Sequence, residues 1–199
     1  MRTTAATLVA VVVLAGGCGH GGHGAISSQR VASLVVARRD LPRGFELYQQ
    51  GKITRFDVGT GPRADLTRFG REDGWRADYR RQGSAVTRGP VLVVSMVDVF
   101  RDDGGAKRDL GAYRQELEST VSSFSGSARM LRLRGLGDES AGMTQLQSGS
   151  PGVRYFTLAW RRANATAAVV VSGFEGKLFL AEALKLARAQ DARLRRAAR

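Results

Sequence analysis

The side chains that most often carry out catalysis or bind metals are scarce in this sequence. It contains one cysteine, Cys18, and two histidines, His20 and His23, all within a short glycine-rich stretch. A single cysteine excludes an internal disulfide framework and a cysteine-rich zinc site. The two histidines could share a copper, nickel or zinc ion, but nothing nearby completes the ligand set. We therefore interpret residues 18–26 as a tether and expect no metal or cofactor.

The densest group of polar side chains lies in a loop formed by Gly135, Gly137, Asp138, Glu139 and Ser140. A serine nucleophile needs an adjacent base, yet no histidine follows His23 and the four lysines are scattered. The two acids could bind a cation or pair with arginine. We interpret the loop as structural, because glycine permits unusual backbone angles and aspartate caps turns. No catalytic constellation is identifiable, and we expect the protein not to be an enzyme.

The N-terminus has the composition of an export signal. Arg2 precedes an apolar run at residues 5–14, interrupted by Thr7 alone, and small residues lead to Cys18. The run is too short to cross a membrane as a helix, which takes about 20 residues. The alternatives for Cys18 are a lipid attachment site, a free thiol left by ordinary signal cleavage, and a signal that is cleaved elsewhere.

The segment Leu14-Ala15-Gly16-Gly17-Cys18 resembles a bacterial lipobox. The resemblance implies a lipoprotein signal peptide at residues 1–17, diacylglyceryl transfer to the Cys18 sulfur, cleavage before Cys18 and acylation of the new amino terminus with a fatty acid such as palmitate. Two or three acyl chains anchor a protein firmly, whereas one chain binds only marginally. We therefore expect a lipid-anchored protein on the extracytoplasmic face of the cell membrane.

The chain is strongly basic. It has 31 Lys and Arg against 18 Asp and Glu, a net charge of +13; removal of Arg2 with the signal leaves 30 against 18, or +12. Twenty-seven of the basic residues are arginines, a bias that GC-rich coding produces without any binding function, and most are spread along the chain. The concentrated part is the end of the chain, with Arg193, Arg195, Arg196 and Arg199. These four could lie at a helix C-terminus for structural reasons alone, or they could contact anionic headgroups. We expect no nucleic-acid partner.

Periodicity predicts one α+β domain at residues 27–199. The expected helices cover residues 27–38, 102–121 and 177–195, with a short helical turn at 64–69. The expected strands cover residues 74–81, 91–100, 130–133, 143–147, 153–162 and 165–173, with a weak strand at 52–58. A tight turn at 162–164 joins the last two strands, and we interpret the sequon that begins at Asn164 as turn chemistry.

The clearest element is the long helix. Asp102 or Asp103 can cap it, and its apolar residues recur every three or four positions: Ala106, Leu110, Tyr113, Leu117 and Val121. This spacing places all five on one stripe. We expect the stripe to pack in the core and not to form a cofactor or partner groove.

The order of elements predicts an antiparallel sheet of about five strands covered by helices. The chain also resembles small exported lipoproteins of unknown function from high-GC Gram-positive bacteria, whose domains are PsbP/Mog1-like. The resemblance rests on five segments, at residues 40–45, 70–79, 97–100, 135–140 and 160–164. It implies a PsbP/Mog1-like fold and supplies no active site.

Three classes of function remain after these exclusions. The leading one is a membrane-tethered, non-catalytic binding or envelope-accessory module. An apolar pocket between sheet and helices would favour a small apolar ligand, and a filled core would favour an unknown protein partner. The alternative is a binder of anionic lipid or another polyanion, which needs a continuous basic face. A hydrolase comes last, and it needs carboxylates that converge in a cleft with perturbed pKa values.

Overall fold

The computed structural model describes residues 24–54 and 61–199. Its strands are β1 (Glu46–Lys52), β2 (Arg71–Arg80), β3 (Leu92–Phe100), β4 (Ser127–Met130), β5 (Glu139–Gln147), β6 (Val153–Arg162) and β7 (Ala165–Phe174). The α-helices are α1 (Asp103–Ser123) and α2 (Leu180–Ala197), and the 3₁₀ helices are η1 (Ser28–Ser33), η2 (Arg38–Asp40) and η3 (Thr67–Phe69). Cys18, His20, His23 and most of the weak strand expected at 52–58 lie outside the described residues.

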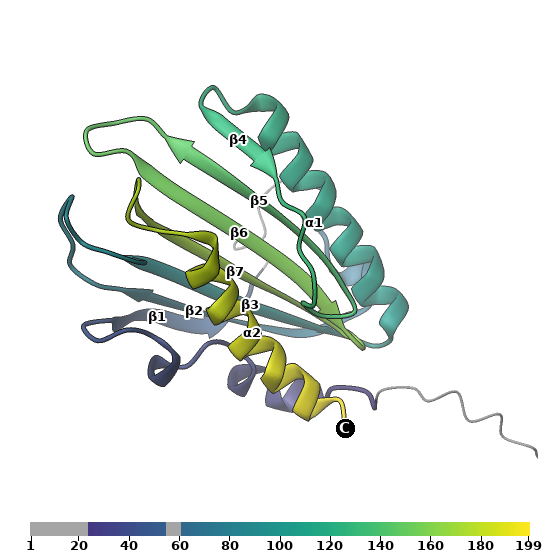
Figure 1. Cartoon of the computed structure of the whole chain (residues 1–199). Helices are drawn as coiled ribbons and strands as arrows, with labels where there is room; N and C mark the ends of the chain where they lie inside the picture. The colour runs from purple at the N-terminus through teal and green to yellow at the C-terminus, as the bar shows by residue number, and fades with distance from the viewer. Residues whose placement is uncertain (1–23, 55–60) are drawn as a thin grey trace, which may run out of the picture.

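All seven strands form one antiparallel sheet in the order β1-β2-β3-β7-β6-β5-β4 (Figure 1). The expectation of about five strands in a PsbP/Mog1-like sheet is therefore wrong. β1 was not predicted because six of its seven residues are exposed, so it has no alternating apolar pattern. β4 has only four residues and begins three positions earlier than the expected strand at 130–133. Both lie at the edges of the sheet. Backbone hydrogen bonds to the neighbouring strand hold them there, although their hydrophobic signal in the sequence is weak.

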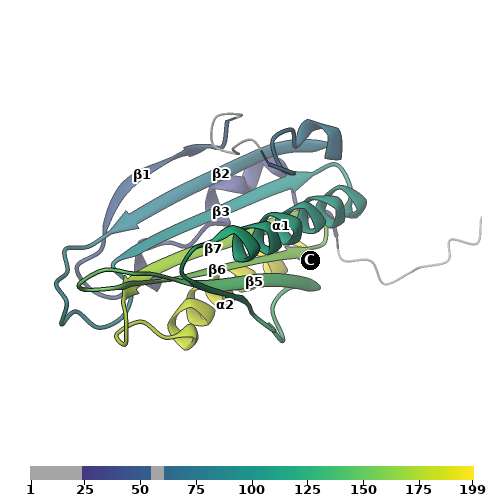
Figure 2. The same ribbon diagram turned by 90° about the horizontal axis from the view of Figure 1, so that it is seen from above.

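The two α-helices pack on opposite faces of the sheet, α1 on one and α2 with η1 on the other (Figure 2). Successive strand residues point to opposite faces, and β6 shows this alternation clearly. Leu158 and Trp160 pack in the core beneath α2, whereas Ala159 packs beneath α1. The continuous apolar runs of the central strands follow from burial on both faces.

The long helix agrees with its prediction. Asp102 is its N-cap, and the Asp102 carboxylate accepts a hydrogen bond from the Gly105 N–H at 2.6 Å. Leu110, Tyr113 and Leu117 are buried against the sheet, with exposed fractions of 1%, 6% and 5%. The core interpretation of this stripe is confirmed.

The helix expected at residues 27–38 is wrong beyond its first turns. η1 ends at Ser33, and Leu34, Val35 and Val36 are all buried, which one face of a helix cannot achieve for three consecutive residues. Tertiary hydrogen bonds hold this segment instead: the Val36 N–H donates to Ser95 Oγ at 2.9 Å, and the Tyr79 hydroxyl donates to the Val36 carbonyl at 2.9 Å. Side chains of the sheet thus replace the helical hydrogen bonds.

Candidate functional site

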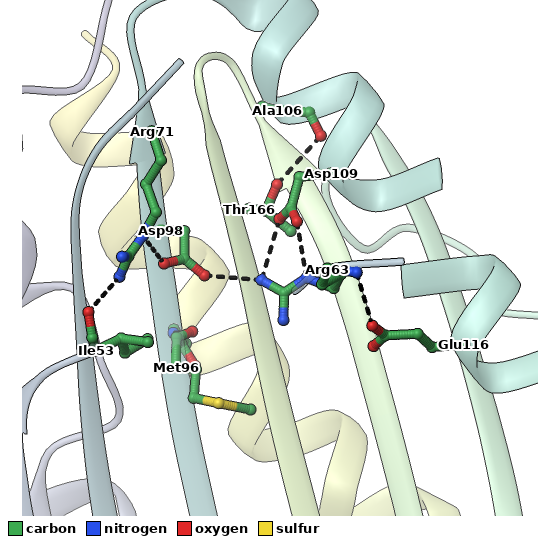
Figure 3. A network of polar contacts seen from close by, with 10 residues as sticks. Ile53, Arg63, Arg71, Met96, Asp98, Ala106, Asp109, Glu116 and Thr166 are labelled. Atoms are coloured by element: carbon green, nitrogen blue, oxygen red, sulfur yellow. Dashed lines mark hydrogen bonds and ion pairs between the residues drawn. The ribbon is translucent and has the colours of Figure 1, made fainter. Parts of the chain in front are cut away.

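A buried ionic network lies where β3, α1 and the segment before η3 meet (Figure 3). β3 contributes Asp98, α1 contributes Asp109, and Arg63 enters between them. The side chains of Arg63, Asp98 and Asp109 are 7%, 3% and 0% exposed. Charged groups are almost never buried so completely unless they are paired, so each depends on the others.

Arg63 bridges the two carboxylates. Its Nε donates to Asp109 Oδ1 at 2.7 Å, and its Nη2 donates to Asp98 Oδ2 at 2.9 Å and to Asp109 Oδ2 at 3.3 Å. The guanidinium also lies over the ring of Tyr113, 3.5 Å from the centroid, which adds a cation–π contact in a dry site. The Arg63 N–H donates to Glu116 Oε1 at 3.0 Å. Arg63 therefore fastens its segment to both α1 and the sheet.

Arg71 is the second cation of the network. Its Nε donates to Asp98 Oδ1 at 2.6 Å, and its Nη2 donates to the Ile53 carbonyl at 2.9 Å. Gly74 leaves room for this contact, because a Cβ at that position would overlap both the Arg71 guanidinium and the Asp98 carboxylate. Asp98 is thus shared by two arginines, whereas Arg63 is the cation bound to Asp109.

Burial and charge shift the proton affinities of these groups. Burial raises the pKa of Asp109 to about 6, although the Arg63 guanidinium acts in the opposite direction. Burial raises the pKa of Tyr113 as well, so its hydroxyl stays protonated. For Arg63, burial acts to lower the pKa, but Tyr113, Asp109 and Asp98 outweigh it and the pKa lies above its ordinary value.

Asp98 and Asp109 thus meet two of the three features expected of a hydrolase, since they converge and one has a raised pKa. They lack the third within residues 24–54 and 61–199, where both are buried and bound to Arg63. Sequence reasoning did not single out this network. A signal was present in Asp98, which interrupts a valine-rich strand, and in Asp109, which lies beside the apolar stripe of α1. Buried carboxylates at both positions require a cation.

The loop at residues 135–140 contains a turn of the backbone and contacts the β6–β7 turn. Gly135 and Gly137 have positive φ angles of 67° and 63°, and Asp138 accepts a hydrogen bond from the Ala163 N–H at 2.9 Å. Ala163 itself has a φ of 49°, so Asp138 stabilises a left-handed residue in the β6–β7 turn.

The acids of this loop are paired with arginines. Arg162 Nη1 lies 2.9 Å from Asp138, and Arg161 Nη2 lies 2.9 Å from Glu139. Ser140 is a half-buried residue of β5. The loop therefore has the contacts of a structural turn.

The four C-terminal arginines do not form one group. Arg193 Nη2 lies 2.6 Å from Asp40 Oδ2, and the Arg193 side chain is only 9% exposed. Arg195, Arg196 and Arg199 are exposed. Arg193 thus links α2 to the N-terminal segment through its ion pair with Asp40. The other three arginines form the exposed cluster.

Hollows open to solvent at several places on the described part of the chain, and two of them exceed 400 Å³. One of about 700 Å³ lies at the start of β1 and the end of β2, with Arg43, Tyr48 and Arg80 in its lining. Another of about 450 Å³ lies beside α2, where Leu41 and Leu186 stand next to charged side chains. Neither has the enclosed apolar lining expected of a carrier of small apolar ligands.

Residues 24–54 and 61–199 hold neither a cluster of metal-ligating side chains nor a membrane-crossing helix. They contain no group of three or more His, Cys, Asp or Glu side chains placed to hold a metal ion. Within the same ranges, no helix has both the length and the apolar character that a membrane crossing requires. The candidate features are therefore the buried network, the open hollows and the exposed arginines.

Comparisons with known proteins identify a likeness of fold. No protein-family model matches the chain, and no curated protein matches it significantly. Among solved structures, the chain is similar to the extracellular domain of PknH from Mycobacterium tuberculosis, with a TM-score of 0.61. The alignment covers 88% of this chain and 100% of that chain at 11% sequence identity. The likeness therefore extends over that whole domain and establishes a shared fold.

Proposed function

We propose that this chain is a non-catalytic binding or envelope-accessory module, held on the extracytoplasmic face of the cell membrane by a lipid on Cys18. The observation that carries the proposal is the fold, which matches the entire extracellular domain of a mycobacterial protein. The sequence supports it independently, because a short apolar export segment ends in a lipobox-like stretch and the sole cysteine. The resemblance to small exported lipoproteins fits the same proposal.

The absence of a catalytic role is supported by how the acidic groups are engaged. A general acid or base must reach the substrate within hydrogen-bonding distance. Asp98 and Asp109 are bound to Arg63 beneath α1, and Asp138 and Glu139 are bound to arginines of β6. Each of these carboxylates stabilises the fold through its arginine.

A protein partner suits the described surface better than a small apolar ligand. The two hollows are open and carry charged side chains, whereas apolar ligands are usually enclosed by hydrophobic walls. The alternative, binding to an anionic surface, is favoured by one observation: Arg195, Arg196 and Arg199 are exposed together at one end of α2. That surface is compatible with the anchor and can act with it.

The proposal is tested by replacing Cys18 with alanine in the full-length chain, expressed in a high-GC Gram-positive host. The variant should be released into the medium or accumulate as an uncleaved precursor, and it should lose incorporation of a labelled palmitate analogue. His20→Ala is the matched control, because it changes the same tether and keeps the thiol. A Cys18→Ala protein that fractionates and incorporates label like the parent would refute the anchor.

A further inference from the structure

The chain enters the folded domain beside the C-terminal end of α2. The Ile26 N–H donates to Asn164 Oδ1 at 2.7 Å, and Asn164 Nδ2 donates to the Ile26 carbonyl at 3.1 Å, which fixes the entry point at the β6–β7 turn. A Cβ placed on Gly24 would lie only 3.4 Å from the Ala198 carbonyl oxygen. Figure 1 shows the first described segment next to the C-terminus at this end of the molecule.

Arg195, Arg196 and Arg199 are exposed at this same corner. Within the described ranges, none of the three has an acidic partner within ion-pair distance, whereas the neighbouring Arg193 is bound to Asp40. The start of α1 has two exposed acids, Asp102 and Asp103, and three exposed cations, which are Arg101, Lys107 and Arg108. The described end of α2 therefore carries three exposed cations without an acidic partner.

The length of the tether limits how far this corner can lie from a lipid on Cys18. Six residue-to-residue steps separate Cys18 from Gly24, and a fully extended chain spans at most about 3.6 Å per step, or about 22 Å in all. The loop at residues 82–90 lies at the opposite end of β3, whose nine residues span about 30 Å. A lipid on Cys18 thus keeps this end of the sheet within about 22 Å of the headgroups, whereas the tether does not hold the opposite end at the surface.

We propose that the surface formed by Arg195, Arg196 and Arg199 faces the membrane and binds anionic phospholipid headgroups, so that the domain presents the opposite end of its sheet outward. In the cell this orientation rests on the proposed lipid anchor at Cys18. Headgroup attraction acts within a Debye length of about 8–10 Å at physiological salt, so it operates only for side chains that a short tether keeps at the surface. The tether keeps the domain close to the membrane, and the three arginines determine which surface of the domain faces the headgroups.

The first experiment measures the arginine surface without the anchor. The chain from Cys18 onward, which contains every described contact, is alkylated at its thiol and sedimented with vesicles of phosphatidylcholine, alone or with phosphatidylglycerol. Arg195→Gln/Arg196→Gln/Arg199→Gln should weaken partitioning onto anionic vesicles at least tenfold, given about fivefold for each arginine near such a surface. Raised salt should abolish the difference.

The matched control removes the same charge from the opposite end. Arg43, Arg80 and Arg88 are exposed there, so Arg43→Gln/Arg80→Gln/Arg88→Gln changes the net charge equally. This control should alter partitioning less than twofold. An equal loss in both triple variants would show that net charge alone drives binding and would overturn the proposal. Equal binding to neutral and anionic vesicles would also overturn it.

The second experiment measures orientation directly. The sole cysteine allows Cys18 to be coupled to a maleimide lipid in either kind of vesicle, independently of lipidation in the cell. Amide hydrogen exchange should slow at residues 193–199 on anionic relative to neutral vesicles and stay unchanged at 82–90, and the Arg195/Arg196/Arg199 triple variant should remove the effect. Exchange that is equal on both vesicles would refute the orientation. Failure of the Cys18→Ala fractionation test would instead refute the anchor, so the two failures are distinguishable.

Discussion

Replacing Arg63 with methionine removes the cation that Asp98 and Asp109 share and keeps most of the length and apolar volume of the side chain. Asp98 retains its contact with Arg71 at 2.6 Å. Asp109 loses both of its hydrogen bonds to the Arg63 guanidinium, at 2.7 and 3.3 Å, and remains fully buried. The substitution therefore leaves one buried carboxylate, that of Asp109, without its cation.

The expected cost is large because an unpaired buried charge is far less favourable than a paired one. Breaking a buried ion pair by removing one partner costs about 3–5 kcal/mol, out of a total stability of about 5–15 kcal/mol for a typical domain. The loss of the cation–π contact with Tyr113 adds to this cost. We expect Arg63→Met to lower the free energy of unfolding by about 3–5 kcal/mol at pH 8.

The cost should depend on pH in a defined direction. Without Arg63, burial should raise the pKa of Asp109 above the value of about 6 that it has in the parent. Between that higher pKa and pH 6, the folded variant binds a proton that the folded parent does not bind. The destabilisation should therefore shrink as the pH falls from 8 to 6, by at most about 1.4 kcal/mol per pH unit.

Urea denaturation at pH 8 and pH 6, followed by tryptophan fluorescence, measures both effects. Arg114→Met is the matched control, because Arg114 is exposed on α1 and should contribute less than about 0.5 kcal/mol. The double variant Arg63→Met/Asp109→Asn should recover at least about 1 kcal/mol relative to Arg63→Met, since it leaves no charge without a partner. A cost below about 1 kcal/mol for Arg63→Met at pH 8, with an unchanged urea slope, would refute this account of the network.

Two further predictions concern single residues of α1. The raised pKa of Asp109 means that the folded state binds a proton more tightly than the unfolded state between pH 3.8 and about 6, so this group lowers stability by about 3 kcal/mol as the pH rises through that window. Asp109→Asn should remove that component from the pH dependence of urea unfolding, and an unchanged profile would contradict the assignment. Leu110→Ala and Leu117→Ala should each cost about 2–5 kcal/mol, because both leucines are buried, and the exposed Gln115→Ala is the control. Unfolding midpoints equal to the parent would show that this face of α1 is not packed.

The elements that could be predicted are those whose signals are local. Asp102 caps α1, and the apolar residues that follow it recur at helical spacing, so the sequence around the helix suffices to define it. The β6–β7 hairpin is similar, because two apolar strands flank a short polar turn and each strand contains its own pattern. The export segment that ends at Cys18 also rests on neighbouring residues, and it stays a prediction because it lies outside the described residues.

The incorrect or missing predictions concern features that depend on distant contacts. β1 is a strand because β2 offers it a backbone ladder, although its own side chains are exposed. The segment at residues 34–36 leaves the helical conformation because Ser95 and Tyr79 hydrogen-bond its backbone. Edge strands and tertiary hydrogen bonds leave no periodic trace in the sequence.

The candidate functional features also fall into those that are visible in the sequence and those that depend on tertiary contacts. The sequence alone determined the basic end of the chain, the sole cysteine and the absence of a histidine base in the domain. Only the tertiary structure separated Arg193, which is bound to Asp40 across 153 positions, from the exposed arginines that follow it. It also brought Arg63 to Asp98 and Asp109, because a buried charge is stable only beside its counter-charge, and that partner is selected by the packing of strand, helix and loop.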